Sequence, residues 1–144
     1  MQKGGERKID VFPKKKRSLI MASIHSKNTK FERSFLEELI ASTSQELELH
    51  PRDIEGVPDA VCRSKRIAIF LDSCFWHGCR THFRMPKSNR EYWSKKIKRN
   101  RKRDRNVSAN LRDHGWRVVR IWEHSLKDKR TRKWWRTRLV NLLR

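Results

Sequence analysis

The sequence predicts a mixed α/β domain in which helices flank a central sheet. Short apolar runs of strand length alternate with longer segments whose apolar residues recur every three or four positions. The predicted order is helix, helix, three strands, helix, strand, helix, and no internal repeat is visible. A chain of 144 residues can bury one such core.

Two helices and three strands are expected in the first half of the chain. Asn28 or Thr29 can cap the second helix, which runs to about Ser42. The last of the three strands is continuously apolar, as a strand buried on both faces would be. The helices are expected at 18–24 and up to residue 42, and the strands at 47–49, 59–62 and 66–71.

The second half predicts a long helix, a strand and a final helix. Ser88 or Asn89 caps the long helix, which ends at Gly115, a residue that readily adopts the left-handed conformation of a helix stop. Residues 116–122 form the strand. The final helix is amphipathic, with Trp135, Leu139, Leu142 and Leu143 on one side.

Charge dominates the composition and predicts a polyanionic partner. The chain has 37 Lys and Arg against 16 Asp and Glu, a formal net charge of +21, and nucleic acid is the leading candidate. The longest clean apolar run, 67–71, is far too short to span a bilayer. We therefore expect a soluble cytoplasmic protein, associated with the nucleoid and not with a membrane.

Residues 1–17 are charged and lack a sustained apolar period, which predicts a flexible basic arm ahead of a single domain at 18–144. Residues 13–17 resemble a nuclear localisation signal. In so basic a chain, an arm that contacts DNA is the favoured interpretation.

A cysteine and histidine cluster at 72–82 predicts a zinc site. Cys74, Cys79 and His82 could converge on one tetrahedral ion, and His124, expected at a strand terminus, is the best fourth ligand. The alternative is that the two cysteines are small buried thiols. His77 has poorer spacing for zinc and is left free for chemistry. Cys62, on an apolar segment, is expected in the core.

Several carboxylates occupy positions where apolar residues are expected. Glu32 projects from the middle of an apolar arc formed by Phe31, Phe35, Leu36, Leu39 and Ile40. Asp104 lies on the inward stripe of the long helix, with Trp93, Ile97, Asn100, Val107 and Leu111. Buried acids need partners, and Asp59 and Asp72 are available near strand ends. Each acid alone could be a capping or salt-bridged residue, but the four beside His77 favour a metal-dependent phosphodiesterase site.

With these residues assembled, the chain resembles the very-short-patch repair endonuclease (Vsr) family of the restriction-endonuclease-like superfamily. The similarity covers roughly residues 17–126 and rests on GVPD at 56–59, SCFWHGC at 73–79, YW at 92–93 and GWRV at 115–118. The resemblance implies a restriction-endonuclease-like fold. It also implies an enzyme that nicks DNA 5′ of the thymine in a T:G mispair, the lesion left when 5-methylcytosine deaminates.

The resemblance also implies roles for the acids and the histidine. Asp59 corresponds to an essential aspartate that binds Mg²⁺, His77 to the histidine that activates the attacking water, and Asp104 to the aspartate that orients it. Glu32 corresponds to a glutamate on the early helix. Asp72 stands where some members carry histidine, so it binds Mg²⁺ directly or through water, or the carbonyl of Leu71 binds instead.

Three aromatic residues, Phe75, Trp76 and Trp93, match side chains that wedge into the base stack beside the mismatch. The implied partner is double-stranded DNA with a T:G mismatch, bound by a monomer that has a functional link to a DNA cytosine methyltransferase. Two alternatives remain: a nuclease of the same fold with another DNA target, or a non-catalytic DNA-binding module stapled by zinc.

Overall fold

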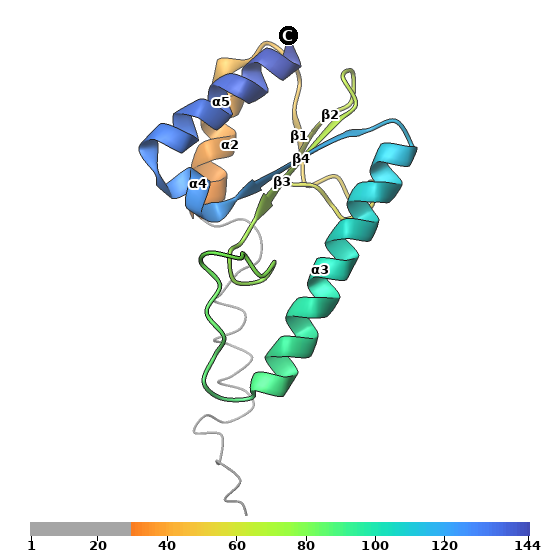
Figure 1. Ribbon diagram of the computed structural model, residues 1–144. Coiled ribbons are helices and arrows are strands. Elements are labelled where there is room, and N and C mark those ends of the chain that lie inside the picture. The colour runs from red at the N-terminus through yellow and green to blue at the C-terminus, as the bar shows by residue number, and fades with distance from the viewer. Residues whose placement is uncertain (1–29) are drawn as a thin grey trace, which may run out of the picture.

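The computed structural model describes residues 30–144, which form a four-stranded sheet with helices on both faces (Figure 1). This confirms the predicted mixed α/β class. The predicted basic arm at 1–17, the helix at 18–24 and the caps Asn28 and Thr29 lie outside the described residues. Within the described part, no helix is both long enough and apolar enough to cross a membrane.

The sheet has the order β1-β2-β3-β4. Strand β3 pairs antiparallel with β2 and parallel with β4, and β1 pairs antiparallel with β2. Every residue of β3 is buried, as its continuous apolar sequence predicts. The strands are β1 (Glu48–Leu49), β2 (Ala60–Cys62), β3 (Ile67–Asp72) and β4 (Arg117–Trp122).

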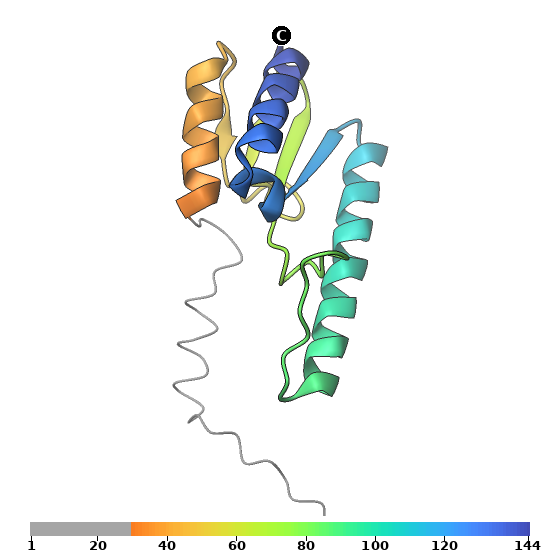
Figure 2. The same ribbon diagram turned by 60° about the vertical axis from the view of Figure 1, so that its left-hand side comes forward.

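Three helices cover one face of the sheet and a single long helix packs on the other (Figures 1 and 2). The first group is α2 (Lys30–Ser42), α4 (Glu123–Lys127) and α5 (Lys129–Leu143), and the long helix is α3 (Arg90–Asp113). A large apolar core lies on the α2 and α5 face and a smaller one under α3. Cys62 is fully buried in the larger core, as predicted.

Some local expectations need correction. Helix α4 was not predicted, because its five residues are too few to show a helical period. Asn89 does occupy the N-cap of α3, but at φ 54° its side chain makes no capping hydrogen bond. Phe31 and Ile40 are 43% and 42% exposed, so the buried arc of α2 is narrower than the sequence suggested. Gly115 follows the end of α3 and adopts the left-handed conformation expected of a helix stop, at φ 84°.

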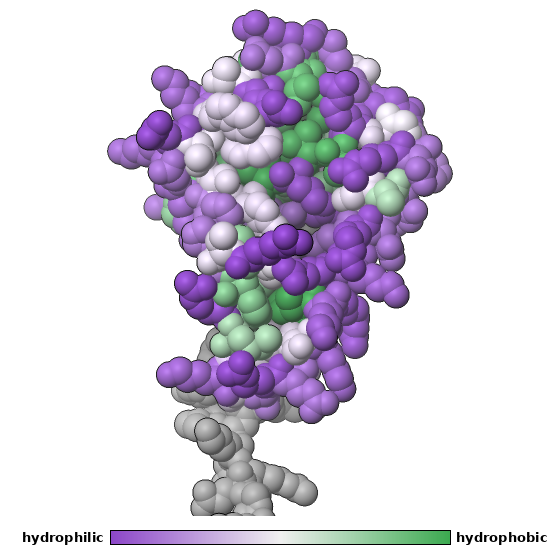
Figure 3. All heavy atoms as spheres, in the orientation of Figure 1, coloured by the Kyte–Doolittle hydropathy of each residue, from purple (hydrophilic) through white to green (hydrophobic). Residues whose placement is uncertain are grey.

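The surface seen in Figure 3 is hydrophilic over most of α3 and α5, and hydrophobic side chains gather in a band between these helices. Strand β4 lies there, at the edge of the sheet. On the face shown, hydrophilic side chains of α3 and α5 therefore border an apolar band along the sheet edge.

Candidate active site and metal centre

Strand alternation brings acids to the α3 face of the sheet. Ala68 and Phe70 of β3 belong to the small core under α3, so Asp72, two residues further on, points to the same side. Asp59 precedes β2, and its Oδ2 accepts a 2.7 Å hydrogen bond from the backbone N–H of Leu71. Asp59 is 2% exposed and Asp72 5% exposed. Two buried carboxylates therefore lie beside the end of β3.

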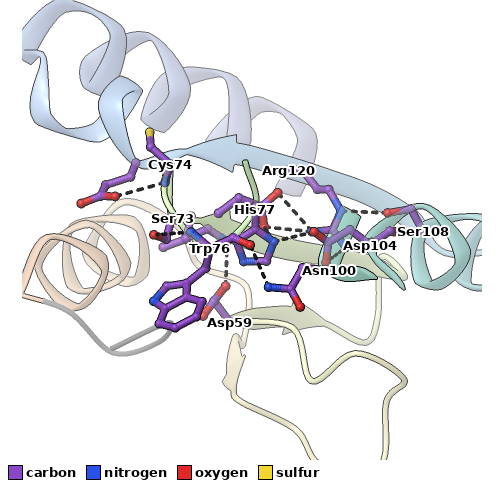
Figure 4. Close-up of polar contacts among 12 residues, drawn as sticks. Asp59, Ser73, Cys74, Trp76, His77, Asn100, Asp104, Ser108 and Arg120 are labelled. Carbon is purple, nitrogen blue, oxygen red and sulfur yellow. Dashed lines mark hydrogen bonds and ion pairs between the residues drawn. The ribbon is translucent and has the colours of Figure 1, made fainter. Parts of the chain in front are cut away.

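His77 lies in the loop after β3 and meets Asp104 of α3 (Figure 4). Its Nδ1 is 2.5 Å from Asp104 Oδ2 and 3.8 Å from Asp72 Oδ1. An N–H on Nδ1 that donates to Asp104 leaves Nε2 as the acceptor, the tautomer that a general base requires. The stripe on α3 that predicted an inward Asp104 thus delivers it to the imidazole.

The loop that carries His77 is held against α3 by close backbone contacts. Gly78 has φ 61°, and a Cβ there would lie 2.6 Å from Cγ2 of Ile97, so glycine is required. The buried Asn100 side chain donates a 2.9 Å hydrogen bond to the carbonyl of Trp76, and Arg101 donates to the carbonyl of Gly78 at 2.6 Å. These contacts fix the position of the imidazole.

Two cavities adjoin His77. One, of about 340 Å³, is lined by Asp59, Asp72 and Asp104 among others. The second, of about 780 Å³, shares His77, Asp72, Asp104 and Arg120 with the first and is lined by four further arginines: Arg80, Arg101, Arg105 and Arg112. The first cavity is suited to a cation and the second to phosphate groups.

Burial raises the pKa of the Asp72 carboxyl above its ordinary value, although electrostatic interactions with the neighbouring His77 and Arg120 side chains oppose this. A carboxylate in such surroundings requires a cation close by. Arg120 supplies one, since its Nη1 donates to Asp72 Oδ1 at 2.8 Å.

Arg120 was missed in the sequence. The signal was a single cation inside the apolar run of 118–122. Only a strand register shows which face it occupies: Arg120 pairs with Phe70, and its guanidinium lies 4.2 Å from that ring centroid.

The four predicted zinc ligands lie together. The ligand atoms of Cys74, Cys79, His82 and His124 are all within 4.8 Å of one another, and His124 Nδ1 is 3.3 Å from the Cys74 sulfur and 3.6 Å from the Cys79 sulfur. His124 comes from the first turn of α4, however, and not from a strand terminus, because β4 ends at Trp122. Two thiols and two imidazoles are a donor set that fits Zn²⁺.

The two thiols differ in acidity. Burial opposes ionisation of Cys79, but hydrogen bonds from Thr81 and His82 outweigh it and lower the thiol pKa to about 6. Burial raises the pKa of Cys74 to about 11, with the neighbouring Cys79 adding to the effect. A metal ion would favour the thiolate form of both.

The three predicted DNA-wedge residues form one aromatic cluster. The Phe75 ring centroid lies 5.2 Å from those of Trp76 and Trp93, both in edge-on geometry. Phe75 and Trp93 are partly exposed, whereas Trp76 is 9% exposed. The adjacent aromatics are therefore divided between surface and interior.

Glu32 is buried, as the arc on α2 predicted, and is 6% exposed. It does not line either of the cavities that adjoin His77. The structure thus groups Asp59, Asp72 and Asp104 at a cavity that His77 also lines, and the role of Glu32 stays a prediction.

Comparisons with known proteins agree with this site. The family model described as DNA mismatch endonuclease Vsr matches residues 9–82. The type II nicking enzyme V.XorIIP of Xanthomonas oryzae pv. oryzae is 41% identical over 115 residues, which cover 78% of this chain and 83% of the relative. The DNA mismatch endonuclease Vsr of Escherichia coli strain K12 is 33% identical over 121 residues, or 83% and 77% of the two chains. The chain therefore belongs to the Vsr family of DNA mismatch endonucleases.

Proposed function

We propose that this chain is a Mg²⁺-dependent endonuclease that nicks duplex DNA 5′ of the thymine in a T:G mispair left by deamination of 5-methylcytosine. The carrying observation is the hydrogen-bonded His77–Asp104 pair beside the buried carboxylates of Asp59 and Asp72. Family membership supports DNA cleavage. The names of several relatives, type II nicking enzymes, favour a cut in one strand.

The acidic cavity fits a hard divalent cation. Asp59 and Asp72 are both nearly inaccessible to solvent and line the same cavity, and carboxylate oxygens are the ligands that Mg²⁺ prefers. Asp59 and Asp72 would hold the ion, which would supply polarisation of the scissile phosphate and a lowered pKa for a water. Leu71 also lines this cavity, and its carbonyl is the proposed alternative ligand. Glu32 is kept in the proposed catalytic set on the family resemblance alone.

The protein's own residues handle the proton. His77 Nε2 accepts it from the attacking water, while Asp104 holds the Nδ1–H and so keeps the imidazole in the required tautomer. General base catalysis of this kind contributes a factor of about 10² to 10⁴.

Mismatch preference is assigned to the aromatic cluster. Side chains that wedge into a base stack meet an unstacking energy of a few kcal/mol, which is lower at a mispair than in matched duplex. Phe75 and Trp93 are the accessible members. Trp76 would join them if the cluster opened on binding, since its ring packs against both.

The basic face of α3 and the preceding loop would hold the DNA backbone. Residues 84–105 carry eleven Lys and Arg against two acids, and most of these cations are exposed. Contacts of this kind position the duplex without reading its sequence. Action as a monomer stays a prediction from the family resemblance. A host DNA cytosine methyltransferase would create the lesion and is the proposed functional link.

Zinc would be held by Cys74, Cys79, His82 and His124 in a structural role, because the loop between the first three ligands carries His77. Cys79→Ala should therefore lower both zinc content, measured by mass spectrometry, and nicking. A folded Cys79→Ala protein that is metal-free and fully active would show that the thiols only pack.

A nicking assay tests the function. The full chain is incubated with Mg²⁺ and duplexes that differ only in one base pair: matched, T:G and other mispairs. We expect one-strand cleavage of the T:G duplex and none when EDTA is added. Equal cleavage of the matched duplex would identify a nuclease with another DNA target. Tight binding without cleavage of any duplex would identify a binding module.

A further inference from the structure

Arg120 is a cation in a position that the rest of its strand face would assign to an apolar side chain. It lies in the middle of β4, opposite Phe70 in the parallel register. Its side chain is 21% exposed. Arg120 lines the larger cavity, but its guanidinium is already engaged by Asp72 and Ser108, so contact with a DNA phosphate does not by itself explain its position.

The guanidinium of Arg120 forms hydrogen bonds with three residues of β3 and α3 (Figure 4). Nη1 donates to both carboxylate oxygens of Asp72, at 2.8 and 3.1 Å. Nε donates to the Ser108 hydroxyl at 2.8 Å, and Nη2 donates to the carbonyl of Asp104 at 3.4 Å. The planar group also lies over the Phe70 ring. These contacts with β3 and α3 therefore fix the orientation of the guanidinium group.

These contacts decide which acid binds the imidazole. His77 Nδ1 has two carboxylates within reach, Asp104 at 2.5 Å and Asp72 at 3.8 Å, but a single N–H donates one strong hydrogen bond. Arg120 binds both oxygens of Asp72 and lies 3.9 Å from Oδ1 of Asp104, which leaves Oδ2 of Asp104 to receive the N–H. The same guanidinium holds the backbone of Asp104 and so fixes the helix turn that presents it.

Stability is a weak explanation for such an ion pair. Desolvation of two charges offsets most of their attraction, and an apolar pair of similar volume often stabilises a protein as well. A pair of aliphatic residues at 72 and 120 would pack on Phe70 and continue the core formed by Val118 and its neighbours. The fork of Arg120 matches the carboxylate and hydroxyl that surround it, a geometry that serves orientation.

We propose that Arg120 is a positioning residue for the nicking reaction: by binding Asp72 and the Asp104 backbone, it directs the His77 N–H to Asp104 and aims Nε2 at the water. This inference rests on the proposed function. It goes further in assigning the orientation of the base to a residue that acts through Asp72 and Asp104 and not by binding the imidazole itself.

The test compares Arg120→Gln and Arg120→Lys with Arg117→Gln. Arg117 is an exposed cation on the same strand, so its replacement removes the same charge without touching the site. Single-turnover nicking of bound T:G duplex is measured with each folded variant. We expect Arg120→Gln to lower the rate constant by about 10²-fold with little change in DNA affinity, since a small misplacement of a catalytic group has effects of this size. Arg120→Lys should recover part of the rate, and Arg117→Gln should equal the parent.

A second readout needs no substrate. In protein labelled with ¹⁵N-histidine, the short His77–Asp104 hydrogen bond should give a downfield imidazole proton signal, assigned by its loss in His77→Gln. We expect the signal to shift or broaden in Arg120→Gln and to stay in Arg117→Gln. An Arg120→Gln protein with an unchanged signal and the parent rate would overturn the proposal. A parent that fails to nick, with the signal still dependent on Arg120, would instead refute the proposed function.

Discussion

The two faces of the sheet have different roles, although the same strands form both: one packs the main apolar core and the other leads to the candidate active site. On the α2 and α5 face, Ile67, Ile69 and Leu71 of β3 enter a large apolar core. On the α3 face, Ala68 and Phe70 begin a smaller core that gives way to Asp72 at the strand end. One strand therefore alternates between residues that hold the fold and residues that lead into the site.

The difference shows how a small domain can hold buried charges. Burying unpaired carboxylates destabilises a protein by several kcal/mol unless cations and donors compensate. Here the apolar face supplies the hydrophobic stabilisation, at roughly 25 cal/mol for each Å² of apolar surface buried. The α3 face can then keep Asp59, Asp72 and Arg120 in place. Substitutions on the α3 face should thus mainly lower activity, and substitutions on the α2 and α5 face should mainly lower the free energy of unfolding.

The largest effect is expected from Asp59→Asn, which removes a buried carboxylate from the acidic cavity while keeping its shape. Nicking should fall by more than about 10³-fold, because nucleophile and scissile phosphate both depend on the proposed Mg²⁺. Thermal stability should fall little or rise, since a buried charge is removed. Rates at saturating DNA and melting temperatures measure both quantities.

Asp53→Asn is the matched control, because its carboxylate is 64% exposed and pairs with Arg63 on the surface. It should nick like the parent. If Asp59→Asn retained most of the activity, the acidic cavity would have only a structural role. The assignment of catalysis to the α3 face would then be wrong.

His77→Ala should reduce the nicking rate by about 10² to 10⁴, the usual contribution of a general base. DNA affinity and bound zinc should be unchanged, because His77 is outside the four-ligand group. Filter binding and metal analysis of the same preparation check this. Loss of zinc from the variant would mean that His77 is a ligand and that another group takes the proton.

Leu139→Ala tests the opposite face. Leu139 of α5 is fully buried in the large core, and truncation of such a leucine lowers the free energy of unfolding by about 2–5 kcal/mol. The folded variant should nick at the parental rate. Urea unfolding and single-turnover nicking at low temperature measure the two effects, and Thr137→Ala, at an exposed position of the same helix, is the control. A large drop in the rate of the folded protein would show that the two faces are coupled.

The smallest effect is expected from Glu38→Gln. Arg132 holds the pKa of Glu38 below its ordinary value of 4.5 through a hydrogen bond between α5 and α2. Because the pKa of Glu38 is lower in the folded than in the unfolded protein, its ionisation stabilises the fold fully at pH values above 4.5. This stabilisation is lost as the pH falls through the folded-state pKa. The pair is partly exposed, so we expect about 1 kcal/mol or less.

Melting curves from pH 3 to pH 7 measure this effect. The difference between parent and Glu38→Gln should be present at pH 7 and shrink toward pH 3, while Glu37→Gln, an exposed neighbour, should show little difference. A difference that grew as the pH fell would have the wrong sign for an ionised Glu38.

The local sequence pattern was enough to predict most helices and strands and most of the candidate site residues. The apolar run at 67–71 predicted β3, and the stripe along 93–111 predicted both α3 and the inward orientation of Asp104. The spacing of Cys74, Cys79 and His82 predicted a common site, and their ligand atoms do lie together with that of His124. Periodicity and ligand chemistry are properties of neighbouring residues, so they are readable before folding.

Other features depend on contacts between residues far apart in the chain. Asp104 meets His77 across 27 residues, and Arg120 meets Asp72 across 48. The division of the aromatic pair, with Trp76 interior and Phe75 partly exposed, follows from the packing of Trp93 against the loop. By itself the sequence determined which residues could do chemistry and on which side of each element they lie. Only the tertiary structure decided which acid holds the histidine and which cation compensates the buried charge, because the register of β4 on β3 and the docking of α3 set those distances.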